Sequence, residues 1–529
     1  MIKLVANIEK NFSVSKAALI VGFFTLASRL MGLVRDRLFA SKFGAGDVLD
    51  AYYAAFRVPD FVFNLLILGT LSIAFIPVFS ELLVGNKQKA NDTASTILNS
   101  TLILMSAVCL LLFLFVEPLT KSLVPGFSGQ KLMDTISLTR LFLLSPIIFT
   151  VSNVFTSMLN AQKKFLSVGL APILYNCGII FGLLALYPKQ GIVGLGYGVI
   201  LGASLHLAVQ LPETFALGFR WRAVLDFKDA AFRKMTRLFL PKIFGLDNSQ
   251  ISLLIGSMVG SLLASGSVAI LNLANNLQAV PLGIFALSIS VASFPALSES
   301  FAKKDSLGFL DILFKSVAQI LFFILPIAVA TLLLRAHIVR LVYGTGQFTW
   351  EDTILTFKTL GIFSISLFSQ SLSPLLGRAF YARQNTIIPV LINSFTMTLN
   401  AFLAFYFGKT YGVAGIAAGF SASSILNLIL LFAALHYFLH KDVPKGSLHE
   451  FDLQIFRQIS KIAISALALG FAMYGALYAV EPYINTRTAI GLFVQAGLAG
   501  IVGGLVYLFV ASSLKLEQAK KFLSLIKLS

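Results

Sequence analysis

Long apolar segments separated by short polar stretches run through the whole chain. Such segments, with Gly and Pro inside them, are typical of transmembrane helices, whereas the strands of a membrane barrel would alternate over about 10 residues. The chain is therefore predicted to be an all-α polytopic membrane protein. The pattern predicts fourteen spans, at residues 17–36, 54–82, 96–117, 139–160, 165–187, 191–216, 237–264, 268–299, 310–334, 353–381, 386–407, 412–438, 456–479 and 488–512.

The first predicted span carries charge at a depth where lipid would not solvate it. Arg29 lies well inside the span, and Arg35 and Asp36 lie at its end. On a helix turning by about 100° per residue, these three share one arc of about 120° with Thr25, Ser28 and Gly32. Because an Arg in lipid costs roughly 3 kcal/mol even on a lenient insertion scale, this stripe is expected to face water, a counter-charge or an anionic ligand.

The second predicted span repeats this arrangement. Arg57, Asp60 and Asn64 follow the spacing i, i+3, i+7 and therefore share one helix face, beside the kink expected at Pro59. Two neighbouring helices are thus expected to turn charge away from lipid.

The two halves of the chain resemble each other. SIAFIPVFSE at 72–81 recurs as SVASFPALSE at 290–299, and Gly191, Gly194 and Gly198 align with Gly412, Gly415 and Gly419. Each repeat holds six spans, an even number, so the two are expected to share one orientation in the membrane. We expect an N-terminal lobe with helices 1–6 (1–217), a C-terminal lobe with helices 7–12 (218–440), and helices 13–14 with a cytoplasmic tail (441–529), the two lobes enclosing a central cavity.

Polar residues of the C-terminal half are further candidates for lining this cavity. They are Lys242 and Gln250 in the seventh span and Asn272 and Asn276 in the eighth. The polar residues of spans ten and eleven, by contrast, are expected to form hydrogen bonds between helices, since such bonds are common in membrane bundles.

Composition agrees with a membrane protein and constrains its topology. Hydrophobic residues make up 57% and charged residues 12% of the 529 residues, and mean hydropathy is +0.86. The net charge of +18 is concentrated in loops on the side that holds both termini, which places the termini in the cytoplasm and argues against a nucleic-acid partner. Cys109 and Cys177 both lie in apolar spans, so neither a disulfide nor a metal site is expected.

Catalytic patterns are absent from the sequence. There is no GxxxxGK[ST] loop and no HExxH, and the five His residues do not cluster with paired carboxylates. We therefore expect a transporter rather than an enzyme, with no catalytic residue, cofactor or metal ion. The aromatic stretch from His337 to Trp350 is interpreted as an amphipathic helix at the outer interface.

Several motifs resemble the MurJ (MviN) family of lipid II flippases. They include SRLMGLVRDRLFASKFGAG at 28–46, residues 50–59, Pro125-Gly126-Phe127, PKIFGLDNSQI at 241–251 and Gly346-Gln347-Phe348-Thr349. The resemblance runs from about Ser13 to His436. It implies the fold of the multidrug/oligosaccharidyl-lipid/polysaccharide exporter superfamily, in the bacterial cytoplasmic membrane. It also implies alternating-access export of the undecaprenyl-diphosphate-linked disaccharide pentapeptide, with cell-wall synthesis proteins and membrane lipids as further partners.

By motif position, the resemblance implies that the cavity residues include Arg29, Arg35, Asp36 and Asp50. The chain departs from the family at two positions, because it has Phe63-Asn64 and Asn275-Asn276 where the family usually has arginines. Arg57, Lys242 or Lys358 are expected to compensate for the lost charge.

The chemistry of the predicted site suits a diphosphate headgroup. Arg provides a fork that matches phosphate oxygens, and moving two negative charges out of an inside-negative cell is favourable by roughly 5 kcal/mol per 100 mV. Membrane potential or an ion gradient could thus drive export. The alternatives are a polysaccharide-lipid flippase or cation-coupled drug exporter of the same superfamily, a polyprenyl-dependent glycosyltransferase, and a non-transporting scaffold.

Overall fold

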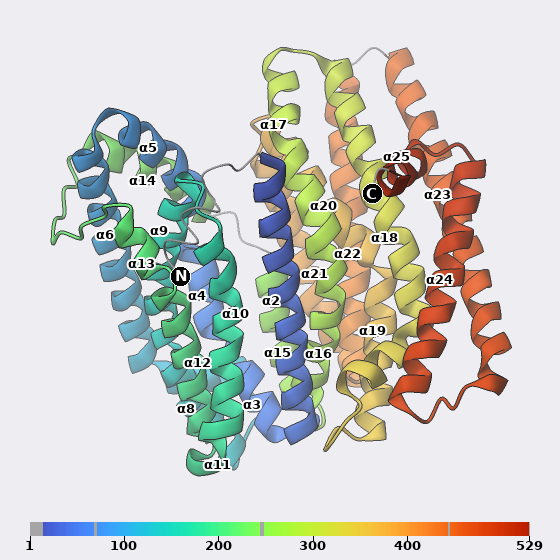
Figure 1. The fold of residues 1–529 in the computed structure, drawn as a ribbon, viewed down its shortest axis with the longest axis horizontal. Helices are drawn as coiled ribbons and strands as arrows, with labels where there is room; N and C mark the ends of the chain where they lie inside the picture. The colour runs from blue at the N-terminus through green and yellow to red at the C-terminus, as the bar shows by residue number, and fades with distance from the viewer. Residues whose placement is uncertain (1–13, 68–70, 244–247, 443–444, 528–529) are drawn as a thin grey trace. The chain divides into compact units, whose positions relative to one another are not determined.

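The computed structural model describes residues 14–67, 71–243, 248–442 and 445–527, and their regular structure is entirely helical (Figure 1). The chain divides into two compact units, Met1–Gly266 and Ser267–Ser529. The prediction of an all-helical protein is confirmed for the described residues.

The first unit contains the charged stripe that the sequence predicts at residues 25–36. Its helices are α2 (Val14–Phe43), α3 (Asp47–Ala55), α4 (Arg57–Leu66), α5 (Leu71–Gly85), α6 (Lys87–Leu114), α7 (Val116–Leu123), α8 (Gly129–Phe142), α9 (Leu144–Ala161), α10 (Leu166–Phe181), η1 (Gly182–Leu186), α11 (Tyr187–Gln190), α12 (Ile192–Ala208), α13 (Leu211–Ala216), α14 (Ala230–Ile243) and α15 (Asn248–Ser261).

The second unit contains the remaining helices and the C-terminal pair. They are α16 (Ser267–Pro281), η2 (Leu282–Leu287), α17 (Ser288–Ala302), α18 (Ser306–Tyr343), α19 (Trp350–Ile365), α20 (Leu367–Ala382), α21 (Ile387–Tyr411), α22 (Val413–Asp442), α23 (Lys445–Val480), η3 (Glu481–Tyr483), α24 (Ala489–Ser513) and α25 (Glu517–Lys527).

Ten helices among the described residues are long and apolar enough to cross a membrane, or eleven if the pair α19 and α20, bent by 45°, counts as one span. They correspond to eleven of the fourteen predicted spans. The other three, at 17–36, 54–82 and 237–264, contain charged or polar residues, and the last two include residues 68–70 and 244–247, which lie outside the described residues. The chain is thus a multi-pass helical membrane protein, and the count of fourteen stays a prediction.

The sequence repeat has a counterpart in local structure. The two copies of the Pro-containing motif lie in α5 and α17, which are both helical with Pro77 and Pro295 inside them. Gly191 and Gly412 have nearly the same backbone angles, with φ 59° and ψ −144° against φ 64° and ψ −145°. Each begins a glycine-rich helix, so the repeat extends to the conformation of single residues.

Close backbone contact holds α10 and its continuation η1 against α12. A Cβ added to Gly182 would lie 2.4 Å from the Cα of Gly198, so these positions can carry only glycine. Small residues of this kind let membrane helices approach closely and gain dispersion contacts.

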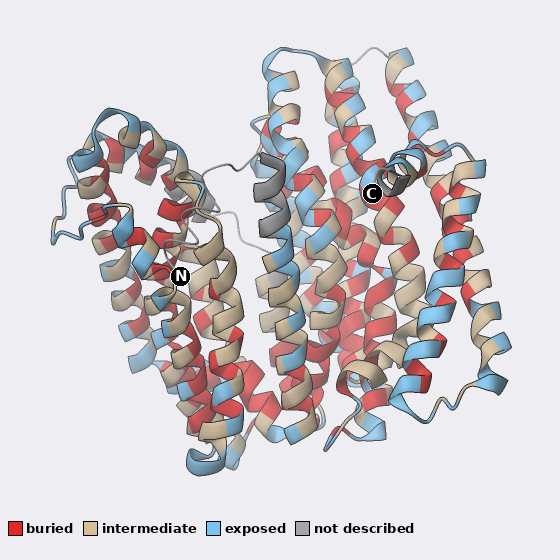
Figure 2. Ribbon diagram, in the orientation of Figure 1, coloured by how far each residue is buried: buried red, intermediate tan, exposed pale blue. Residues whose placement is uncertain are grey.

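The core of the second unit forms around α18 and α20. Phe309, Ile320, Leu375 and Phe380 are fully buried there. Figure 2 shows more exposed residues along α23 and α24 than in this core. In a membrane protein such apolar exposed faces are expected to contact lipid.

One interpretation of the sequence is wrong. The stretch from His337 to Trp350 is not a separate amphipathic helix, because His337–Tyr343 form the last part of α18 and residues 344–349 connect it to α19. The helix continues through Arg335, His337 and Arg340, which the sequence analysis placed beyond the end of the span at 310–334.

The boundary between the compact units lies after Gly266, whereas the sequence places the lobe boundary after 217. A division into compact units does not show which spans belong to which sequence repeat. The division into lobes at 1–217 and 218–440 therefore stays a prediction.

Candidate functional site

The charged stripe of α2 is shielded relative to the apolar face of the same helix. Leu26, Leu30 and Val34 are exposed, with about half of each side chain accessible. Asp36 is only 3% exposed, and Arg29 and Arg35 are partly buried. The orientation predicted from helical periodicity therefore agrees with the observed burial.

Arg35 and Asp36 form an ion pair within α2. Arg35 donates from Nε and Nη2 to Oδ1 of Asp36, at 2.9 and 2.8 Å. Side chains of adjacent residues in a helix do not usually face one another. The long Arg35 side chain therefore bends toward Asp36 to form this pair. Asp36 thereby compensates much of the positive charge that the sequence assigned to the site.

The remaining nitrogen of Arg35 connects α2 to α10. Nη1 donates to Oδ1 of Asn176 at 3.0 Å, and Asn176 donates from Nδ2 to the carbonyl of Pro172 at 3.0 Å. The bond to Pro172 fixes which side of the amide faces Arg35. Asn176 is thus a positioning residue that sequence reasoning missed, because helical spacing within α10 does not reveal which helix lies opposite.

Arg57 is buried in a second polar contact, between α4 and α15. It is 7% exposed and donates from Nε to Oγ of Ser257 at 2.8 Å. Asp60 lies within electrostatic range of both Arg57 and Arg35, so one carboxylate connects the two parts of the charged cluster. Together the three candidate arginines (Arg29, Arg35, Arg57) and the two aspartates (Asp36, Asp60) carry one formal positive charge.

Asn64 uses its amide within its own helix. Its Nδ2 donates to the backbone carbonyl of Asp60 at 2.7 Å. This bond uses one of the two N–H groups of the amide and leaves its oxygen as an acceptor.

Asp50 lies in a separate ion cluster between α3 and α8. It is 1% exposed, and its Oδ2 accepts from Nζ of Lys131 at 2.6 Å and from the backbone N–H of Gly266 at 2.8 Å. Lys131 also pairs with Asp47 at 2.7 Å, and Asp47 accepts from the hydroxyl of Ser265 at 2.7 Å. The two carboxylates therefore attach the end of the first unit, residues 265–266, to α3.

The backbone at Gly266 requires glycine. Its φ is +86°, and an added Cβ would lie 1.9 Å from the carbonyl oxygen of Ala45. Hydrogen bonds from Lys131 and then Ser265 lower the pKa of Asp47 below its ordinary value. Asp47 is therefore charged at neutral pH.

Comparisons with known proteins identify the family. The family model described as "Lipid II flippase MurJ" matches residues 39–496. The chain belongs to the lipid II flippase MurJ family. This is a family of transporters, so the prediction of a transporter rather than an enzyme is confirmed.

Individual relatives agree with this family. The chain is 31% identical to the "Probable lipid II flippase MurJ" of Vibrio cholerae over 433 residues, which cover 80% of this chain and 82% of that protein. It superposes on a solved "Lipid II flippase MurJ, inward closed conformation" with a TM-score of 0.75, 25% identity, and coverage of 93% of this chain and 98% of the other. An inward-facing MATE family multidrug resistance transporter gives a TM-score of 0.63 at 15% identity and covers 78% and 95% of the two chains, which shows a shared fold.

In this MurJ-family chain, α16 of the second unit carries a group of neutral amide side chains. Asn272 is buried and donates to the carbonyl of Val268 at 2.7 Å, and Asn276 is half-buried. Gln278 donates to Asn275 at 3.0 Å and accepts from Gln370 at 3.0 Å. The amide face of α16 thus continues as a hydrogen-bonded network into α20.

Interhelical hydrogen bonding in spans ten and eleven is confirmed. Ser366 of the bent span α19–α20 donates to Ser421 of α22 at 2.9 Å. Asn427 of α22 donates to Asn393 of α21 at 2.8 Å and to Thr396 at 2.9 Å.

The predicted site residues of this family member are therefore only partly brought together. Arg35, Asp36, Arg57 and Asp60 form one cluster in the first unit, whereas Asp50 belongs to the separate cluster with Lys131. Gln250 is half-buried on α15. The side chain of Lys242 lies outside the described residues.

Proposed function

We propose that this chain flips lipid II, the undecaprenyl-diphosphate-linked disaccharide pentapeptide, from the cytoplasmic to the outer leaflet by alternating access. The observation that carries the proposal is membership of the lipid II flippase MurJ family over residues 39–496. Buried arginine in a membrane helix supports it, because an anionic headgroup needs charge-assisted hydrogen bonds away from bulk water.

The proposed architecture follows from the sequence repeat. Fourteen helices would form two parallel six-helix lobes, at 1–217 and 218–440, around a central cavity, with two further helices at 441–529. Both termini would lie in the cytoplasm, as the distribution of Lys and Arg favours. The matched conformations of Gly191 and Gly412 support two copies of one ancestral unit.

Each candidate side chain has a proposed role. Arg29, Arg35 and Arg57 would bind the diphosphate, since Arg presents a planar fork to phosphate oxygens. Asp36 would hold Arg35 in position, and Asp50 would hold the connection at Gly266. Asn64, Gln250, Asn272 and Asn276 would bind sugar or peptide groups, and Lys242 would contribute a further charge.

The compensated charge of the cluster bears on energy coupling. A site with little excess positive charge leaves much of the diphosphate's negative charge to move with the substrate, so that an inside-negative potential favours export. We therefore propose membrane potential as the driving force, with an ion gradient as the alternative.

Complementation tests the proposal in cells. The chain should sustain growth and cell shape when the host's own lipid II flippase is depleted, and an Arg35→Ala variant of equal abundance should not. A polysaccharide-lipid flippase or a drug exporter would leave the depleted cells to lyse, and that outcome would refute the proposal.

A further inference from the structure

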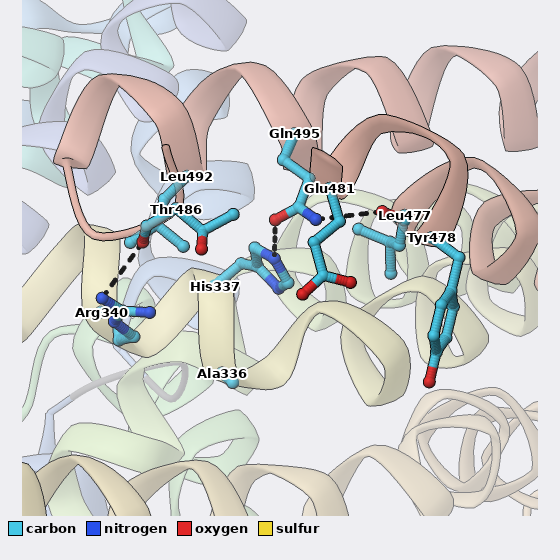
Figure 3. Close-up of a pocket in the computed structure, with 9 residues that line it drawn as sticks. All are labelled: Ala336, His337, Arg340, Leu477, Tyr478, Glu481, Thr486, Leu492 and Gln495. Carbon is cyan, nitrogen blue, oxygen red and sulfur yellow. Dashed lines mark hydrogen bonds between the residues drawn. The ribbon is translucent and has the colours of Figure 1, made fainter. Parts of the chain in front are cut away.

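A cavity of about 220 Å³ lies within the second unit, between α18, α23 and α24 (Figure 3). This volume is below the roughly 300–1,000 Å³ of sites for drug-sized ligands, so it suits a small polar group. Arg340 and His337 line it from α18, and Glu481 and Gln495 line it from η3 and α24. The cavity thus carries a cation and a carboxylate, and none of these residues belongs to the charged cluster of the first unit.

The hydrogen bonds around His337 leave one of its ring nitrogens without a partner. Gln495 donates from Nε2 to the carbonyl of Leu477 at 3.1 Å, which leaves its Oε1 to accept from Nε2 of His337 at 3.0 Å. The other ring nitrogen, Nδ1, is buried and has no hydrogen-bond partner in the structure. With the proton on Nε2, the neutral ring presents Nδ1 as an acceptor.

A ligand that donates hydrogen bonds therefore fits beside His337. Glu481 forms no ion pair among those of the described residues, and Figure 3 shows its carboxylate directed toward the His337 ring. A carboxylate and a ring nitrogen acceptor together suit a primary ammonium group, which has three N–H donors.

Arg340 provides the opposite chemistry at the other end of the cavity. Its Nη2 donates to the carbonyl of Thr486 at 3.3 Å, and its guanidinium lies 5.5 Å from the ring of Trp350. A guanidinium has five N–H donors, so this one contact leaves others to bind a phosphate. Arg340 and Glu481 are drawn on opposite sides of His337 in Figure 3.

The surroundings of the cavity indicate a lipid rather than a soluble ligand. The helices α18, α23 and α24 are all long and apolar enough to cross a membrane. Phe471 of α23 and Ile490 and Phe493 of α24 are 69–78% exposed, and Tyr478 is 59% exposed at the cavity itself. Tyrosine near the end of a membrane span is typical of the membrane interface, and the apolar face beside it can accommodate an acyl chain.

We propose that this cavity binds the headgroup of a phospholipid that carries one phosphate and one primary ammonium group, of the phosphoethanolamine class. Arg340 binds the phosphate, and Glu481 and Nδ1 of His337 accept from the ammonium. The acyl chains lie along the exposed faces of α23 and α24. This lipid is a bound component of the protein and not the transported substrate.

Native mass spectrometry of the full-length protein in nanodiscs tests this assignment. An equimolar mixture of phosphatidylethanolamine, phosphatidylcholine and phosphatidylglycerol supplies the three headgroups. The protein should retain phosphatidylethanolamine about tenfold over the other two, because losing one charge-assisted hydrogen bond amounts to about that factor. Trimethylation removes the N–H donors of the choline headgroup, and the glycerol headgroup has no cation for Glu481.

Variants separate the two ends of the site. Glu481→Gln should abolish the preference for phosphatidylethanolamine, and Glu481→Lys should turn it toward phosphatidylglycerol, a gain that a misfolded protein could not show. Arg340→Gln should weaken retention of all three lipids. Arg487→Gln, which removes an exposed cation from the same connection outside the cavity, is the matched control and should behave as the unchanged protein.

Three results would overturn the proposal. The first is equal retention of the three headgroups by the unchanged protein, and the second is the same lipid profile for Glu481→Gln and Arg487→Gln. The third is binding of soluble phosphoethanolamine as tightly as the lipid, because the acyl chains would then contribute nothing to recognition.

Discussion

The guanidinium of Arg57 in α4 donates from Nε to the hydroxyl of Ser257 in α15 at 2.8 Å, although the two residues are 200 positions apart in the sequence. Both side chains are buried, and Asp60 lies within electrostatic range of the same guanidinium. Arg57 therefore combines a structural contact with the charge that is proposed to bind the diphosphate. Substitutions can separate these two roles.

Arg57→Ala should nearly abolish flipping, as Arg29→Ala should, because it removes a cation from a cluster with little excess charge. Ser257→Ala is the matched variant, since it keeps the charge and removes one charge-assisted hydrogen bond, worth about 1.5–3 kcal/mol. It should lower thermal stability and leave measurable flipping. Asn276→Arg should partly rescue Arg57→Ala. Normal flipping by Arg57→Ala, with Asn276→Arg inactive, would instead make Arg57 a structural partner of Asp60.

Asp36→Asn should destabilise the protein by about 3 kcal/mol, the low end for breaking a buried ion pair, because Arg35 is 22% exposed at its side chain. The double variant Arg35→Gln/Asp36→Asn should recover most of that stability but no flipping. Thermal unfolding in detergent and a flipping assay on the same preparations measure the two effects. Equal instability of the single and double variants would contradict a direct pair between these residues.

Asp50→Asn should destabilise the protein more than Asp47→Asn, because Asp50 is 1% and Asp47 61% exposed although both pair with Lys131. The lowered pKa of Asp47 means that its contribution is present above its unfolded pKa, about 3.9, and is lost as the pH falls through the folded value. The difference between Asp47→Asn and the unchanged protein should therefore shrink in acid. Thermal unfolding at pH 7 and at a series of pH values below the unfolded pKa checks this, and a difference that grows in acid would exclude the assignment.

Arg29→Cys, on a background without Cys109 and Cys177, should react with a membrane-impermeant thiol reagent, because the polar stripe of α2 is proposed to face a water-filled cavity. Leu30→Cys, on the exposed apolar face of the same helix, is the control and should stay unlabelled in lipid. Absence of labelling at position 29 from either side of the membrane would count against the cavity.

Periodicity and repeats were sufficient to predict helices, eleven of the fourteen membrane spans and the orientation of α2. The exposed Leu26 and Leu30 and the buried Asp36 follow directly from a turn of about 100° per residue. The constant shift between SIAFIPVFSE and SVASFPALSE likewise corresponds to two helices that each contain a proline. These features depend on residues close together in the sequence.

Contacts between distant helices could not be predicted in the same way. Arg35 meets Asn176 across 141 positions, and Lys131 meets Asp50 across 81. Each partner is an ordinary polar residue on its own helix, so no local pattern marks it. The cavity at His337 was missed for a related reason, since it exists only where α18 meets the C-terminal pair.

Flipping by the purified protein tests the central claim most directly. Proteoliposomes that contain fluorescent lipid II, with the chain in one orientation and an imposed potential, report transfer by the accessibility of the headgroup to an external enzyme. We predict transfer that depends on the potential and is lost in Arg35→Ala at equal protein density. Lipid II that stays in its original leaflet with the unchanged, correctly inserted protein, at every potential, would contradict the account.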